Sequence, residues 1–203
     1  MRKNIVTLAL LVVLLVAAIP ALASTQAANT NTVSPTLKAN VTVQDAVQLT
    51  LSSGAGCTIS AGGGADFSMN FGNVDALAIN APTCGNKFAP TTPGTTSAVY
   101  YTDYLITPVY TSQPLTANPT VTAYVSTNFA KANLSIVQAN SLPGSIAAMT
   151  AMSLSSSSQT SVATNAASTT ALTRYLGVAI APTNGAGLTG ADAATITYTL
   201  TVQ

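Results

Sequence analysis

The sequence predicts an all-β fold, an antiparallel β-sandwich, and three observations support this prediction. Apolar and polar residues alternate with a period of two in one stretch after another, which is the pattern of strands with one buried face. Clusters of Gly, Pro, Asn and Thr separate these stretches, as turn residues do. Outside an apolar run near the N-terminus, no stretch carries a clear helical stripe with capping residues. Short strands joined by turns are typical of sandwiches and barrels.

The N-terminus has the organisation of a secretory signal peptide over residues 1–23. A short basic stretch is followed by an apolar run that ends in the small-residue pattern Ala21-Leu22-Ala23. The alternative is a membrane anchor, but the apolar stretch before Pro20 is near the lower limit for crossing a bilayer, and no basic stop signal follows it. The sequence therefore predicts a secreted chain that begins at Ser24 and has no membrane segment after the signal is removed.

The first candidate strand lies in residues 38–51, after a polar tail over residues 24–37. Its alternation places five apolar side chains on one face: Val41, Val43, Val47, Leu49 and Leu51. Asp45 interrupts that face. Either a bulge at Gln44-Asp45 restores the apolar face, or a neighbouring group caps the carboxylate.

Further strands are expected where the same alternation returns, at residues 66–72, 97–110, 119–126, 132–138 and 171–182. In the last of these, Arg174 shares a face with apolar residues. The Ser-, Ala- and Thr-rich stretch 141–170 is expected to be a long loop with a weak strand, with an O-glycosylated patch as the alternative. Within it, residues 145–152 have the composition of a turn or two of helix.

The final stretch, Thr195 to Gln203, alternates more regularly than any other. It places Ile196, Tyr198, Leu200 and Val202 on one face and threonines on the other. This pattern predicts a strand at the edge of the core.

The chain has two cysteines, Cys57 and Cys84, and no C-x-x-C motif. In a secreted chain an isolated pair is most simply one disulfide, although two buried thiols are the alternative. On the chain-entropy model such a bond stabilises the fold by roughly 3–4 kcal/mol.

The composition argues against several classes of function. The chain has 6 Lys and Arg and 5 acidic residues, all Asp, and it has no His and no Trp. Without His and Glu most general acid–base pairs cannot be built, so we expect no enzyme and no cofactor. The five Asp residues fall in no calcium-loop pattern. With no basic patch, nucleic acid and anionic membranes are poor partners, and such sparse charge suits a protein that lives assembled.

One segment resembles a known family. Residues 39–79 run from an alternating strand through Cys57-Thr-Ile-Ser to "NFGNVD", and the chain closes on a Thr-, Val- and Tyr-rich strand. This is similar to the spore coat protein U family and the related archaic chaperone–usher pilins. The resemblance covers the first third of the chain after the signal peptide, and the last strand. It departs in two places: Cys84 lies in a loop-like stretch, and residues 87–170 match no pattern of the family.

The resemblance implies an immunoglobulin-like sandwich that lacks one strand and is completed by the N-terminal segment of a neighbouring subunit. Residues 38–51 would be that donor strand, and residues 52–203 would form the sandwich. Ile196, Tyr198, Leu200 and Val202 would then border the groove that the donor fills. The alternative is that residues 38–51 are simply the first strand of a complete sandwich.

The implied function is that of a structural subunit of an extracellular filament or coat. Its partners would be copies of itself, and its assembly factors a periplasmic chaperone and usher. The alternative is a self-contained secreted adhesin or carbohydrate-binding module, for which the clustered Tyr100, Tyr101, Tyr104 and Tyr110 are the main argument. Core and cross-strand packing is the preferred account of those tyrosines. Two sequons, at Asn40 and Asn133, match the glycosylation acceptor pattern, and chance is the simpler explanation of both.

Overall fold

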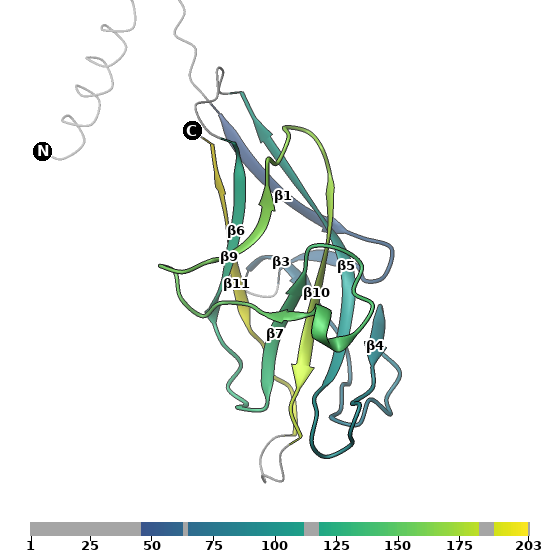
Figure 1. The fold of residues 1–203 in the computed structure, drawn as a ribbon. Coiled ribbons are helices and arrows are strands. Elements are labelled where there is room, and N and C mark those ends of the chain that lie inside the picture. The colour runs from purple at the N-terminus through teal and green to yellow at the C-terminus, as the bar shows by residue number, and fades with distance from the viewer. Residues whose placement is uncertain (1–45, 63–64, 112–117, 183–188, 203) are drawn as a thin grey trace, which may run out of the picture. The chain divides into compact units, whose positions relative to one another are not determined.

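The computed structural model describes residues 46–62, 65–111, 118–182 and 189–202 (Figure 1). In these residues the chain is built of strands and loops, with one short 3₁₀ turn, η1 (Ile146–Ala148). All strand pairs in the described part are antiparallel, which confirms the predicted all-β sandwich class.

The larger sheet contains six strands in the order β1-β5-β10-β7-β8, and β4 pairs with β5 beside this path. The strands are β1 (Val47–Ser53), β4 (Asn86–Phe88), β5 (Ala98–Tyr110), β7 (Leu134–Ala139), β8 (Thr150–Ala151) and β10 (Leu172–Ile180).

The smaller sheet contains three strands in the order β11-β6-β9, and a separate hairpin joins β2 to β3. These strands are β2 (Ile59–Gly62), β3 (Ala65–Met69), β6 (Thr120–Thr127), β9 (Thr160–Thr164) and β11 (Thr195–Thr201). In Figure 1, β6, β9 and β11 lie together as one layer, and β5, β10 and β7 belong to the other.

The main core lies between the two sheets. Tyr100, Tyr104 and Ile106 from β5 are fully or almost fully buried there, together with Val121 from β6 and Val162 from β9. Tyrosine and β-branched residues suit these positions because they pack well on a pleated surface.

The outer face of the larger sheet carries a second apolar cluster. Val99 and Tyr101 of β5 are buried there with Val137 and Met149, and Phe88 of β4 stacks on Tyr101 with ring centroids 4.7 Å apart. Because consecutive residues of β5 point to opposite faces, this strand is buried on both sides and reads as an almost continuous apolar run. The packing account of the clustered tyrosines therefore holds for Tyr100, Tyr101 and Tyr104, which are buried in these two clusters.

The stretch 141–170 holds more structure than the predicted loop and weak strand. It contains η1, the two-residue strand β8 and the five-residue strand β9. The helix expected within residues 145–152 is reduced to η1, because β8 then pairs with β7. The strand partner outside the segment decides its conformation, and local composition does not report that partner.

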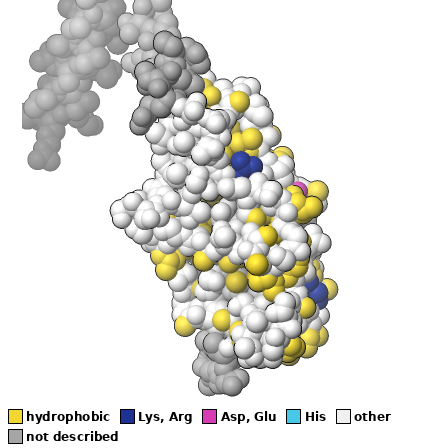
Figure 2. Space-filling model, viewed as in Figure 1, with side chains coloured by type: hydrophobic (Ala, Val, Ile, Leu, Met, Phe, Trp, Pro, Cys, Tyr) yellow, Lys and Arg dark blue, Asp and Glu magenta, His cyan; other side chains and the backbone are white. Residues whose placement is uncertain are grey.

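Charge on the surface is sparse, as the composition requires. On the face that Figure 2 shows, Lys, Arg and Asp side chains are few and scattered, and hydrophobic side chains gather in a band across the middle.

Candidate functional site

The last strand leaves one edge of the smaller sheet open. β11 pairs with β6 from Thr195↔Thr127 to Thr201↔Thr120, with a bulge between Thr195 and Ile196. No described strand pairs with its other side. An edge of this kind presents backbone N–H and C=O groups that a further strand can pair with.

A large groove with a mixed apolar and polar lining lies beside β11. Its volume is about 1620 Å³, and its lining comes from three parts of the fold. The larger sheet contributes Leu176, Val178 and Ile180 of β10 with Leu134 and Ile136 of β7. The smaller sheet contributes Ile196 and Tyr198 of β11, and the segment around β3 contributes Met69, Phe71 and Val74. Many of these side chains are only partly buried by the chain's own packing.

Two tyrosines from opposite sheets meet in the groove lining. The hydroxyl of Tyr198 donates to the hydroxyl of Tyr104 over 3.0 Å, and the rings meet edge to face with centroids 6.1 Å apart. Burial raises the pKa of Tyr104 to about 12. Burial also raises the pKa of Tyr198 well above its usual value, and the neighbouring Tyr104 adds to this. Both phenols therefore stay neutral hydrogen-bonding groups.

One rim of the groove is held by Asp192, just before β11. Its carboxylate accepts hydrogen bonds from the backbone N–H groups of Lys131, Ala130 and Ala193, and the Lys131 ammonium lies 3.9 Å away. The bond from the Lys131 N–H is the main reason that the pKa of Asp192 lies below its usual value. These contacts fix the entry of β11 to the segment before β7.

The opposite rim is a tight loop over residues 75–80. The Asp75 carboxylate accepts from the N–H groups of Leu77, Ile79 and Asn80 and from the hydroxyl of Tyr100. Burial alone would raise the pKa of Asp75, but these hydrogen bonds outweigh it and the pKa lies below 3.8. The Lys87 ammonium donates to the backbone oxygens of residues 78–80. The loop is thereby held from both sides.

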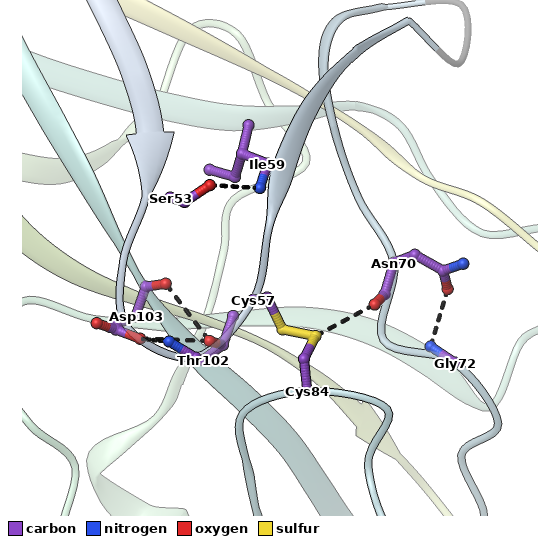
Figure 3. Close-up of a disulfide and its surroundings, with 9 residues drawn as sticks. Ser53, Cys57, Ile59, Asn70, Gly72, Cys84, Thr102 and Asp103 are labelled. Carbon is purple, nitrogen blue, oxygen red and sulfur yellow. Dashed lines mark hydrogen bonds between the residues drawn. A yellow bond between two sulfur atoms is a disulfide. The ribbon is translucent and has the colours of Figure 1, made fainter.

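A disulfide between Cys57 and Cys84 ties this region together, as predicted (Figure 3). It joins the turn after β1 to the loop before β4, with Cα atoms 5.0 Å apart. Near it the Asp103 carboxylate accepts from the N–H groups of Ala55 and Gly56. A Cβ at Gly54 would lie 2.3 Å from Asp103 Oδ2, so only glycine lets the turn approach this closely.

The donor-strand prediction needs a correction for Val47, Leu49 and Leu51. The structure places them in β1, where Val47 pairs with Tyr110, Leu49 with Pro108 and Leu51 with Ile106 of the same chain. Leu49 and Leu51 pack against the main core and line the groove from their own side. Residues paired with their own β5 are the chain's first strand, so the sandwich begins at β1 and not at residue 52. Val41 and Val43 lie outside the described residues.

The other predicted site residues fall in different places. Ile196 and Tyr198 line the groove, and Leu200 packs against the core further along β11. Val202 follows the end of the strand and is half-buried. Asn133 lies before β7 in the groove lining, and its side-chain oxygen is buried with no hydrogen-bond partner in the described part. Asn40 lies outside the described residues.

Sequence reasoning missed the far wall and the rims of the groove. Val74 and Phe129 follow strands, where alternation gives no signal. The contact of Asp192 with Lys131 joins positions 61 apart in the sequence, and no local pattern reports it.

Comparisons with protein families, with curated proteins and with solved structures find no significant match to this chain. Within the described ranges no helix is long and apolar enough to cross a membrane. The same residues contain no group of three or more Cys, Asp, Glu or His side chains that is placed to hold a metal ion.

Proposed function

We propose that this chain is a structural subunit of an extracellular filament or surface coat, and that each subunit completes its neighbour by donating a strand. The observation that carries the proposal is the edge of β11, with which no other described strand pairs on that side, beside a groove of about 1620 Å³ whose lining includes apolar side chains from both sheets. A strand added there satisfies the backbone groups of the edge and covers the groove in one step.

The strand order supports an immunoglobulin-like arrangement. The order β1-β5-β10-β7 corresponds to strands A, B, E and D of that fold, and β11-β6 corresponds to strands F and C. In a complete domain a further strand, G, pairs with F. In the described part of this chain no strand takes that place beside β11. The incoming strand would act as G.

The donor segment that we propose is residues 38–45, from a second copy of the chain. Ala46 bonds to Thr111 of its own chain and residues from Val47 onward pair with their own β5, so the donated part ends before Ala46. The segment is about as long as β11, which has 7 residues, and Val41 and Val43 share one face. Each buried valine contributes about 1.5–3 kcal/mol and each ladder hydrogen bond about 1 kcal/mol, before the cost of ordering the segment.

Donation in one direction around a series of subunits is a heterologous contact, and such contacts build filaments. A location outside the cell agrees with the signal-peptide pattern over residues 1–23 and with the disulfide, since such bonds persist in oxidising compartments. The sparse charge agrees with a chain that is stable when assembled.

The test compares the chain that begins at Ser24 with a chain that begins at Gln44. The longer chain should form filaments visible by electron microscopy. The shorter chain keeps β1, so it should fold, remain monomeric and gain thermal stability when a peptide of residues 38–45 is added. A longer chain that stays monomeric, or a shorter chain that assembles equally well, would contradict the proposal and favour a self-contained adhesin.

A further inference from the structure

The groove contains a hydrogen-bond donor that the described chain leaves unused. Tyr104 of β5 and Tyr198 of β11 both line the groove, and their hydroxyl oxygens are 3.0 Å apart. Two hydroxyls carry two protons, and the bond between them uses one. Among the described residues no other oxygen accepts a hydrogen bond from either hydroxyl. One proton is therefore left over in an apolar setting, where an unpaired donor is costly.

Among the polar groups of the lining, the carboxylates of Asp75 and Asp192 are already paired, whereas the Asn133 side-chain oxygen has no partner in the described part. Asp192 accepts three hydrogen bonds from backbone N–H groups. Asp75 accepts three from backbone N–H groups and one from the hydroxyl of Tyr100. Arg174 lies opposite Tyr104 in the register of β5 and β10, but it is a donor only, and its Nε binds the carbonyl of Val162. The tyrosine pair and the nearby guanidinium thus favour an acceptor, and a negative charge favours it further.

We propose that the incoming strand brings an acceptor to the tyrosine pair, and that this acceptor is the Asp45 carboxylate of a second copy. This inference rests on the proposed function and names the contact that sets the register of the donated strand. A strand that turns Val41 and Val43 toward the groove turns Asp45 the same way, because side chains on one face repeat every second residue. The hydrogen bond to the tyrosine pair would then account for an acidic residue on the otherwise apolar face of this segment.

The experiment is a double-mutant cycle in the chain that begins at Ser24, in which two changes are made separately and together. One change is Asp45→Leu, and the other is the pair Tyr104→Phe with Tyr198→Phe, which removes both hydroxyls and keeps both rings. Removing both partners of one hydrogen bond is close to neutral for folding, and thermal unfolding of each variant checks this. The measured quantity is the protein concentration at which half the chain sediments as filaments.

The two phenylalanine changes should raise this concentration at least about tenfold when Asp45 is present, because the carboxylate then enters a groove without a donor. In the Asp45→Leu chain the same two changes should shift the concentration needed for assembly by less than about threefold. Equal shifts in both chains, or no shift in either, would overturn the inference while leaving the proposed function intact. If the unaltered chain fails to assemble, the proposed function falls and this inference with it.

A second readout needs no tyrosine variant. Ultraviolet resonance Raman spectra of tyrosine differ between hydroxyls that donate to a carboxylate and hydroxyls that do not. The spectrum should change when the unaltered chain assembles and should not change when the Asp45→Leu chain assembles. The same change in both chains would show that Asp45 is not the acceptor.

Discussion

The two edge strands of the smaller sheet, β9 and β11, differ in the side chains that hydrogen-bond to their backbones. At one edge, β9 receives hydrogen bonds from two side chains of the rest of the sandwich: Arg174 Nε binds the carbonyl of Val162, and Asn140 Nδ2 binds that of Ser161. At the other edge, β11 pairs with β6. Among the described residues, the one side chain that donates to the backbone of β11 is Ser126, which also lies on β6. The chain's own side chains therefore contact the backbone of β9 from outside the smaller sheet, and no described side chain from outside the sheet donates to the backbone of β11.

Under the proposed function, this difference would direct an incoming strand to one edge of the smaller sheet. An uncapped edge recruits any extended segment, so two such edges would allow disordered growth. Side-chain donors on β9 and a bulge in its pairing with β6, between Val121 and Thr122, make that edge a poor template. Of the two edge strands of the smaller sheet, each paired only with β6 among the described residues, β11 is the one that also borders the groove.

The largest effect is expected from a charge in the donated segment. Val43→Asp should raise the concentration needed for assembly by about a hundredfold, because it places a carboxylate against apolar side chains. The variant should still fold with the stability of the unaltered chain, since residue 43 precedes β1. Sedimentation measures the first quantity and urea unfolding the second.

Leu49→Asp is the matched control for that prediction. Leu49 is paired with Pro108 and packs against the main core, so the same chemical change should destabilise the fold itself by about 3 kcal/mol or more. If both variants fold normally and both fail to assemble, then Leu49 belongs to the donor after all and the corrected boundary is wrong.

A smaller effect is expected at the capped edge. Arg174→Met keeps most of the apolar stem but leaves the Val162 carbonyl without its donor, which should cost about 1–3 kcal/mol in urea unfolding. Thr199→Val, on the exposed face of the uncapped strand β11, should be close to neutral. Equal stability of the two variants would mean that the cap on β9 does not matter and that the comparison between the edges fails.

Sequence alone predicted the strands better than their partners. Alternation located β6, β10 and β11, because each has one face on the core. It could not distinguish a donated strand from the chain's own β1, because residues 47–51 alternate in the same way in either case. Only the register with β5 decides this, and pairing across 50 or more positions leaves no local trace. For the same reason the groove, the Tyr104–Tyr198 contact and the Arg174 cap required the structure.

The smallest expected effect concerns the loop at the groove rim and its response to pH. The pKa of Asp75 in the folded chain lies below 3.8, so its carboxylate stabilises the fold at pH values above about 3.8, and this stability is lost as the pH falls through the folded-state pKa. The pKa values of Asp103 and Asp192 are also lowered, so their carboxylates likewise contribute stability that is lost in acid. In Asp75→Asn the melting temperature should be lower at pH 7, and should fall less between pH 5 and pH 2.5 than in the unaltered chain. The two curves should therefore converge in acid. Parallel curves for Asp75→Asn would instead show that the hydrogen bonds to Asp75 do not hold the loop, and that the groove rim beside the open edge is not fixed in advance.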